Sequence, residues 1–285
     1  MWGWTVERTT VFALLDAFYA AGGREVDTAT NYPIDKNPAH WRLAETWLAE
    51  WLLANGVRDM RVMIKVGSVN NLKTPEQRLG KSFLLMLLAD YQRRFRSNLD
   101  TFMLHWDNRA DEAAIRDTYA GLRVVADEGL RLGLSGIKYP ELHATVNADY
   151  GFDFRVQVKH NLLQSDYLRY AAFHGGRRFI AYGVNAGGVK LDGQYDDASS
   201  LISRGGSTAP PLDLAALRAL GQRVAPPLTT FNAFGTLFAV AHPDFSGILL
   251  GPSRVAQLED SLTLLDRIAT GALDDLLPEL RRLAH

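Results

Sequence analysis

Strand-like and helix-like segments alternate along almost the whole chain, and this alternation limits the folds that are open to it. The strand-like segments are short apolar runs, and runs with apolar residues at helical spacing follow them. Seven strands are clear, at residues 24–29, 61–67, 99–105, 130–136, 154–161, 178–185 and 245–252. Residues 2–5, "WGWT", would supply the stub of an eighth strand, placed first. Strands and helices alternating in this way over 285 residues predict an α/β fold, the parallel (β/α)8 or TIM barrel.

A doubly wound open sheet is the alternative architecture. It would usually carry G-x-G-x-x-G after a strand to bind a dinucleotide, and the chain contains no such motif. Because no domain boundary interrupts the alternation, we expect a single domain over residues 1–285. A loop rich in Gly, Ser and Asp runs from 186 to 211 inside it. Its length indicates a lid or cofactor clamp, with a disordered surface insertion as the other interpretation.

Two helix starts can be predicted from local residues. A helix over 74–95 would have Thr74 as its N-cap, Pro75 in its first turn and Gln77 completing a capping box. Another helix is expected from about Asp166, after the fifth clear strand.

Composition excludes several classes of function. The chain has no cysteine, which excludes disulfides, thiolate nucleophiles and zinc sites built on cysteine. The formal net charge of -1 gives no field that would attract nucleic acid or an anionic membrane. No apolar run approaches the roughly 18 residues of a membrane helix, and the first residues lack the layout of a signal peptide. The histidines show no metal spacing. We therefore expect a cytoplasmic protein without a metal site.

Polar side chains end three consecutive strands. Asp27 ends the strand 24–29, with Tyr32 in the loop beyond it, Lys65 lies near the end of the strand 61–67, and His105 ends the strand 99–105. In a barrel the carboxyl ends of the strands form the active site, so these four side chains should converge. Each one alone also has a structural interpretation, as a helix cap, a partly exposed lysine or a core histidine.

The four residue types suit the reduction of a carbonyl group. A tyrosine hydroxyl is too weak an acid at neutral pH, and a neighbouring ammonium favours its phenolate. A carboxylate holds the ammonium charged, and a histidine donates a hydrogen bond to a substrate oxygen. Tyr32 would then give a proton to the oxygen while a hydride reaches the carbon. Since no side chain supplies a hydride, a nicotinamide cofactor is implied.

The chain resembles the aldo-keto reductases over nearly its whole length. "GREVDTATNY" is similar to the family's Asp-Thr-Ala-x-x-Tyr segment, "VMIKVG" to its lysine strand and "LDTFMLHWD" to its histidine strand. The resemblance implies that Asp27, Tyr32, Lys65 and His105 are catalytic. Trp106, next to the histidine, would line the substrate pocket, with core packing as the other interpretation.

The resemblance extends to the cofactor side. "LGLSG" is similar to the family's Gly-x-Ser-Asn, "IAYGVNAGG" to the segment whose aromatic residue stacks on the nicotinamide, and "GPSRVAQLEDSL" to the segment that binds the adenosine phosphate. Arg254 favours NADPH over NADH, because a guanidinium beside a helix N-terminus suits a phosphate. The implied cofactor-binding residues are Ser135, Gln157, Tyr182, Gly183, Gly251, Ser253, Arg254, Gln257, Asp260 and Ser261.

The chain also departs from the family pattern. Gly136 replaces the usual Asn or Arg after the serine, and Asp260 and Ser261 replace a usual Glu-Asn. Residues 33–44 form an insertion beside Tyr32 and should shape the substrate pocket. The chain begins almost inside the first barrel strand, through either a trimmed start or a missing first segment.

We expect an NADPH-dependent oxidoreductase that reduces a small aldehyde or ketone, or oxidises the alcohol. The alternative is a nucleotide-binding regulatory or sensor subunit of the same fold with little turnover. A cofactor-free barrel lyase or isomerase is a third class, and it predicts no NADPH binding.

Overall fold

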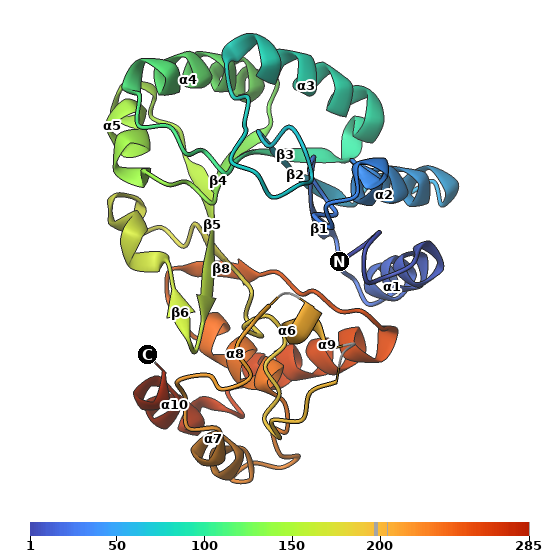
Figure 1. Ribbon diagram of the computed structural model, residues 1–285, viewed down its shortest axis with the longest axis vertical. Coiled ribbons are helices and arrows are strands. Elements are labelled where there is room, and N and C mark those ends of the chain that lie inside the picture. Colours follow the sequence, from blue (N-terminus) through green and yellow to red (C-terminus); the bar gives the residue numbers. More distant parts are fainter. Residues whose placement is uncertain (197–198, 204, 285) are drawn as a thin grey trace. The chain divides into compact units, whose positions relative to one another are not determined.

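The computed structural model describes residues 1–196, 199–203 and 205–284. It comprises two compact units (Figure 1). The first consists of Met1–Val156 with Gly251–Leu258, and the second of Gln157–Leu250 with Glu259–His285.

The first unit alternates strands and helices. Its strands are β1 (Glu25–Ala29), β2 (Arg61–Val66), β3 (Leu99–His105) and β4 (Arg131–Ser135), and they pair in chain order, all parallel. Its helices are α1 (Arg8–Ala20), α2 (Leu43–Ala54), α3 (Lys81–Phe95), α4 (Glu112–Asp127) and α5 (Pro140–Tyr150). In Figure 1, α3, α4 and α5 follow one another along one side of the sheet. The predicted β/α alternation with parallel strands is confirmed here.

The register of these strands separates two kinds of side chain. Successive residues of a strand face opposite sides, and apart from Thr28 and Asp100 the even-numbered positions of β1 to β4 are apolar and buried. They include Val26, Val62, Ile64, Phe102, Leu104, Leu132 and Leu134. Most of the polar groups stand at odd-numbered positions, among them Asp27, Lys65, Thr101, His105 and Ser135.

One row across the odd face is formed by Ala29, Lys65, Met103 and Gly133, which are paired in register. The two long side chains, Lys65 and Met103, are neighbours in this row, and a small residue stands at each end. A Cβ at Gly133 would come within 2.4 Å of the Met103 Cε atom, so the methionine occupies the space that the glycine leaves. His105 pairs with Ser135 one row nearer the carboxyl ends of the strands.

The second unit holds the remaining strands. β5 (Phe154–Asn161) begins in the first unit and continues into the second, where it forms a short antiparallel pair with β6 (Gln164–Ser165). β7 (Phe179–Tyr182) pairs in parallel with β8 (Phe245–Ile248). The helical segments are η3 (Tyr167–Phe173), α6 (Ser200–Ser203), α7 (Leu214–Gly221), α8 (Phe231–Val240), α9 (Val255–Ala269), η4 (Asp274–Leu276) and α10 (Leu277–Leu283). α9 begins in the first unit.

The predicted loop 186–211 contributes to the core of the second unit. Val189, Leu191 and Leu201 are buried in one apolar cluster with Leu217 and Phe234 of α7 and α8. The loop also contains α6. Residues 197, 198 and 204 of this loop lie outside the described residues. Its proposed action as a lid or clamp stays a prediction.

Two predicted helix starts are wrong. The helix predicted over 74–95 begins only at Lys81, because the residues before it are held in other ways. Thr74 exchanges hydrogen bonds with the Asn70 side chain, and Gln77 forms an antiparallel bridge with Ser68. The first-turn amide of Lys81 donates to Asp117 of α4, at 2.8 Å. The cap therefore comes from a distant carboxylate.

The helix expected from about Asp166 is only the 3-10 segment η3, interrupted by non-helical backbone at Tyr170. Residues 2–5 do not form a strand: an isolated bridge joins Trp2 to Val6 around a turn. α1 and α10 were not anticipated from the sequence.

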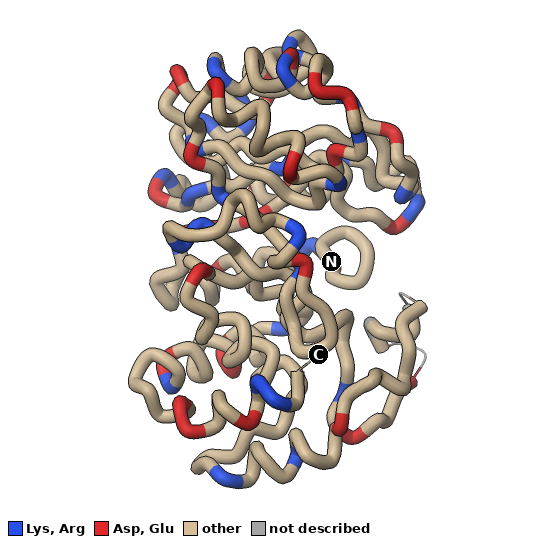
Figure 2. Tube along the Cα trace, turned by 90° about the vertical axis from the view of Figure 1, so that its left-hand side faces the viewer, with Lys and Arg blue, Asp and Glu red and all other residues tan. Residues whose placement is uncertain are grey.

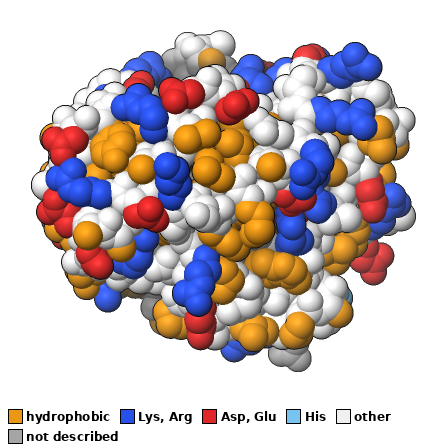
Figure 3. Space-filling view, turned by 90° about the horizontal axis from the view of Figure 1, so that it is seen from above, with side chains coloured by type: hydrophobic (Ala, Val, Ile, Leu, Met, Phe, Trp, Pro, Cys, Tyr) orange, Lys and Arg blue, Asp and Glu red, His pale blue; other side chains and the backbone are white. Residues whose placement is uncertain are grey.

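Acidic and basic residues are spread along the backbone of both units (Figure 2). On the face seen in Figure 3, acidic, basic and apolar side chains are interspersed. This agrees with the near-zero net charge. Among the described residues, no helix has both the length and the apolar character needed to cross a bilayer.

At the amino ends of β1 to β5, Glu25 forms the centre of an ionic cluster. Arg155 donates to its Oε1 at 2.6 Å, and Arg61 and Arg131 lie 3.3 Å from its Oε2. Burial alone would raise the pKa of Glu25, but these guanidinium groups lower it below its ordinary value. A carboxyl whose pKa is lower in the folded than in the unfolded protein stabilises the fold at pH values above the unfolded-state pKa. This stabilisation is lost as the pH falls through the folded-state pKa.

We expect Glu25→Gln to lower the free energy of unfolding by about 1 kcal/mol at pH 7, because three guanidinium groups lose their carboxylate. The difference from the wild type should shrink as the pH falls below about 4, where the wild-type carboxyl also becomes protonated. Urea unfolding at several pH values measures the loss at pH 7 and its dependence on pH. Glu50→Gln, which breaks the exposed pair with Arg8, is the control and should have a smaller effect. A pH-independent loss at Glu25 would contradict the ionic explanation.

Candidate active site

Lys65 is the most deeply buried charged side chain of the predicted site. Its side chain is 2% exposed and forms an ion pair with Asp27 Oδ2, from the neighbouring strand. Burial alone would lower the pKa of the Lys65 ammonium, but the charges and hydrogen bonds of Asp27 and Tyr32 raise it above its ordinary value. Lys65 therefore stays cationic at neutral pH.

Tyr32 lies beside this ammonium. Lys65 Nζ is 4.9 Å from the centroid of the Tyr32 ring. The backbone of Tyr32 is held on both sides: its amide donates to Ala29 O at 3.1 Å, and its carbonyl accepts from Ala44 N at 3.2 Å. The second bond joins the two ends of the insertion 33–44. The insertion is thus a closed loop directly behind the tyrosine.

His105 completes the group. Its ring centroid lies 6.0 Å from that of Tyr32, and the two rings are nearly perpendicular, at 85°. Burial, and next the charge of Lys65, hold the pKa of the His105 imidazole well below its ordinary value, so the ring is neutral. Its buried Nδ1 atom has no hydrogen-bond partner in the described part of the chain. The structure thus brings all four predicted catalytic residues together within the first unit.

Trp106 and Gly136 fit each other closely. Trp106 has a left-handed backbone, with φ of 58°, and its amide donates to Ser135 O at 3.0 Å. Gly136 has φ of +66°, and a Cβ there would come within 2.5 Å of Trp106 Cδ1. The indole therefore occupies the space that a side chain at 136 would need. This gives a physical reason for glycine at position 136.

A buried ionic network next to Trp106 was missed from the sequence. The Asp107 carboxylate accepts two hydrogen bonds from the Arg109 guanidinium, at 2.9 and 2.6 Å, and one from the Arg109 amide, and it lies 3.2 Å from His143 Nε2 on α5. Burial alone would raise the pKa of Asp107, but Arg109 and His143 hold it well below its ordinary value. Its carbonyl accepts from Lys138 N at 2.8 Å. The network fixes the loop that follows β3. The only sequence pattern that indicates it is an acidic and a basic residue two positions apart in "WDNR".

Part of the predicted cofactor set lies in the first unit. Ser135 is 4% exposed at the end of β4, and Gly251 is exposed. Just before α9, the Ser253 amide and hydroxyl both donate to Gln257 Oε1, at 2.9 Å each. Arg254 is exposed, and no carboxylate pairs with it among residues 1–196, 199–203 and 205–284. An exposed, unneutralised guanidinium at a helix start fits a phosphate.

The other predicted cofactor residues lie in the second unit. Gln157 is 1% exposed on β5, and Tyr182 is half-buried at the end of β7. The carbonyl of Gly183 accepts from Asn161 Nδ2 at 2.9 Å. On α9, Asp260 is exposed, whereas Ser261 is 7% exposed and its hydroxyl lies 3.4 Å from Asn232 Nδ2.

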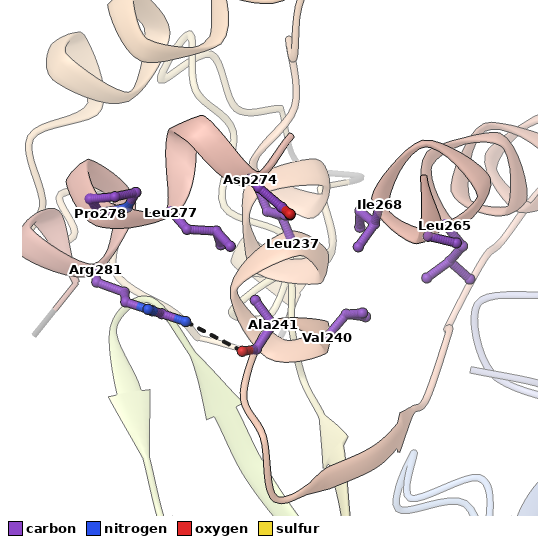
Figure 4. Close-up of a pocket in the computed structure, with 10 residues that line it drawn as sticks. Leu237, Val240, Ala241, Leu265, Ile268, Asp274, Leu277, Pro278 and Arg281 are labelled. Carbon is purple, nitrogen blue, oxygen red and sulfur yellow. Dashed lines mark hydrogen bonds between the residues drawn. The ribbon is translucent and has the colours of Figure 1, made fainter. Parts of the chain in front are cut away.

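A cavity of about 720 Å³ in the second unit contains none of the predicted site residues. It lies between α8, α9 and the segment η4–α10 (Figure 4). Aliphatic side chains point into it, and Arg281 donates to Ala241 O at its edge. The lining residues are Leu237, Val240, Ala241, Leu265, Ile268, Ala269, Asp274, Leu277, Pro278 and Arg281. Across the described residues, no group of three or more potential ligands could hold a metal ion.

We expect Gly136→Ala to destabilise the protein by about 1–3 kcal/mol, since the methyl group must displace the indole of Trp106. Gly151→Ala is a matched control, because Gly151 has the same φ of +66° but nothing within 4 Å of its Cβ position. The two variants share the cost of the left-handed backbone. Urea unfolding followed by tryptophan fluorescence should show a larger loss for Gly136→Ala. If both variants lose the same free energy of unfolding, the contact with Trp106 does not contribute to the cost of Gly136→Ala.

The aldo/keto reductase family model matches residues 1–270. A putative aryl-alcohol dehydrogenase of Saccharomyces cerevisiae (AAD14) is 26% identical over 204 residues, which cover 65% of this chain and 51% of that protein. A norsolorinic acid reductase of Emericella nidulans is 28% identical over 62% of this chain and 40% of its own length. An NADP(+) aryl-alcohol dehydrogenase of Phanerodontia chrysosporium is 30% identical over 46% of this chain and 35% of its own length. The chain thus spans about half the length of the yeast relative.

The match covers nearly the whole chain, and it agrees with the parallel strands and flanking helices described above. The predicted (β/α)8 fold class is confirmed on these grounds. The chain therefore belongs to the aldo/keto reductase family.

Proposed function

We propose that this protein is an NADPH-dependent oxidoreductase that reduces an aldehyde or ketone, or oxidises the corresponding alcohol, with Tyr32 as general acid. The observation that carries the proposal is the buried ion pair of Lys65 and Asp27 beside the Tyr32 ring. Family membership and relatives named aryl-alcohol dehydrogenases support an oxidoreductase more generally.

Each side chain has a separate role in this proposal. Tyr32 gives its phenolic proton to the substrate oxygen. The Lys65 ammonium stabilises the phenolate that remains, because an opposite charge within a few ångströms favours the ionised form. Asp27 keeps Lys65 charged and oriented. A bound nicotinamide would supply the hydride, which no amino-acid side chain can provide.

His105 acts as a neutral hydrogen-bond donor rather than as an acid. Its depressed pKa keeps a second positive charge away from Lys65. The neutral imidazole still carries one N–H, which orients the substrate oxygen toward Tyr32. Trp106, whose ring centroid is 4.7 Å from that of His105, forms a wall of the substrate pocket. An indole wall favours flat aromatic carbonyl compounds.

The cofactor is assigned to the residues that the family resemblance implies. Ser135, Gln157 and Tyr182 would contact the nicotinamide, with Gly183 at the same strand end. Ser253 and Arg254 would hold the 2′-phosphate, with Gly251, Gln257, Asp260 and Ser261 around the adenosine. The unneutralised Arg254 supports NADPH over NADH.

Tyr32→Phe should lower kcat for an aromatic aldehyde by about 100-fold or more, because general acid catalysis is typically worth 10²–10⁴-fold. The affinity for NADPH should change little, since the phenyl ring remains. Steady-state NADPH oxidation and quenching of tryptophan fluorescence measure the two effects. A variant that keeps more than about a tenth of the wild-type rate would rule out Tyr32 as the acid. NADPH binding by the wild type without turnover of any carbonyl would favour a regulatory subunit.

Arg254→Ala should raise the Kd for NADPH by about tenfold or more, because a charge-assisted contact to the phosphate is lost. The Kd for NADH should stay the same, and NADH therefore serves as the internal control. Fluorescence titration with both cofactors measures the difference. Parallel changes in both affinities would contradict a specific contact with the 2′-phosphate.

A further inference from the structure

A buried hydrogen-bonded chain runs behind the predicted site, on the side of α2 and α3. It begins at Lys65, whose main-chain carbonyl accepts from Thr30 N at 3.0 Å and from Thr30 Oγ1 at 3.1 Å. Thr30 Oγ1 lies 2.9 Å from Tyr91 OH, and Tyr91 OH donates to Glu45 Oε2 at 2.7 Å. Thr30, Glu45 and Tyr91 are 5%, 0% and 0% exposed.

The far end of this chain is anchored by Arg42. Its Nε donates to Glu45 Oε1 at 2.5 Å, and its Nη2 donates to Asp90 at 2.5 Å. The guanidinium also lies over the Tyr91 ring, 5.2 Å from the centroid. Arg42 has a left-handed backbone, with φ of 64°, directly before α2. Its side-chain contacts therefore hold a backbone conformation that is unfavourable for a residue other than glycine.

Glu45 accepts at both oxygens, from Tyr91 at Oε2 and from Arg42 at Oε1, although burial raises the pKa of its carboxyl. A carboxylate only accepts hydrogen bonds, so the Tyr91 proton points to Glu45. The Thr30 hydroxyl then has one proton for two possible acceptors, the Lys65 carbonyl and the Tyr91 oxygen. Thr30, Tyr91 and Glu45 thus form one hydrogen-bonded series that starts at the Lys65 carbonyl.

This series ties together the two sides of the Tyr32 loop. Thr30 precedes Tyr32 by two residues, and Glu45 follows Ala44, whose amide binds the Tyr32 carbonyl. Tyr91 of α3 bridges Thr30 and Glu45, and it contacts neither the Asp27–Lys65 pair nor His105 in any described hydrogen bond. The buried Tyr91 hydroxyl thus links the two sides of the base of this loop, beside the backbone bond between Ala44 and Tyr32.

We propose that Tyr91 is a positioning residue that, through Thr30 and Glu45, holds Tyr32 and the insertion 33–44 at the reacting centre. The inference rests on the proposed function for its kinetic consequence, but its structural consequence can be measured without turnover. Misplacement of a catalytic group by about 1 Å costs on the order of 100-fold in rate. A partly loosened loop should therefore lower kcat while leaving cofactor binding intact.

Tyr91→Phe tests the proposal, because it removes one oxygen and keeps the ring. Amide hydrogen exchange of the free protein should accelerate about tenfold in peptides covering 29–45, where the amides of Thr30, Tyr32 and Ala44 are bonded. In the same variant, kcat for carbonyl reduction should fall about tenfold, with the KM for NADPH unchanged.

Tyr119→Phe is the matched control. Tyr119 is also 0% exposed, and its hydroxyl donates to His143 O on α5, at 3.0 Å, away from the Tyr32 loop. It should not accelerate exchange in 29–45. A second pair of variants, Thr30→Val and Thr30→Ser, separates the hydroxyl from side-chain volume. Thr30→Val should reproduce the Tyr91→Phe effect, and Thr30→Ser should restore wild-type exchange.

The outcomes separate this inference from the proposed function. Exchange in 29–45 that is as slow in Tyr91→Phe and Thr30→Val as in Tyr119→Phe would overturn the positioning role, whatever the activity. Faster exchange with unchanged kcat would also overturn it, since the loop would move without consequence for Tyr32. If the wild type reduces no carbonyl compound but exchange in 29–45 is faster in Tyr91→Phe and Thr30→Val, the proposed reaction is wrong. The role of Tyr91 in holding the loop is then still supported.

Discussion

The structure of the first unit depends on one buried positive charge. Removing an ammonium from water is costly unless a counter-charge and hydrogen bonds replace the solvent. Lys65 obtains these from Asp27 and Tyr32, and from no other charged group described around it. This requires Asp27 and Lys65 to share one face of neighbouring strands, and it requires the loop after β1 to return Tyr32 to the same place. The parallel register provides the first, and the bonded ends of the insertion 33–44 provide the second.

Hydrogen bonding extends this arrangement outward. The main-chain carbonyl of Lys65, one peptide unit from the charge, is the start of the Thr30–Tyr91–Glu45 series. On the other side, His105 and Trp106 lead into the Asp107–Arg109 pair and its contact with His143. Both networks use buried groups that are costly to leave without partners. The helices around the sheet therefore do more than cover it, since α2, α3 and α5 each contribute a polar group that fixes a loop at the strand ends.

The sequence was informative where a pattern is local. A two-residue period in short apolar runs predicts strands, and polar residues at the ends of those strands predict a meeting point, so Asp27, Lys65 and His105 could be found together. The start of α3 could not be predicted, because its cap is Asp117, from another helix. The role of Gly136 was equally hidden, since the indole that needs its space is thirty residues earlier. Glu45 and Tyr91 read as ordinary helix positions, because only the tertiary structure joins them.

The row of Ala29, Lys65, Met103 and Gly133 has a consequence for sequence divergence. Two long side chains share this layer only because each stands beside a residue with almost no volume. Close packing allows little excess volume in such a layer. Relatives that keep a lysine at this place and a long residue on the next strand must therefore keep the flanking positions at the size of alanine or glycine. A larger side chain at one of the four positions requires a smaller one at another. Substitutions at these positions should therefore covary between relatives.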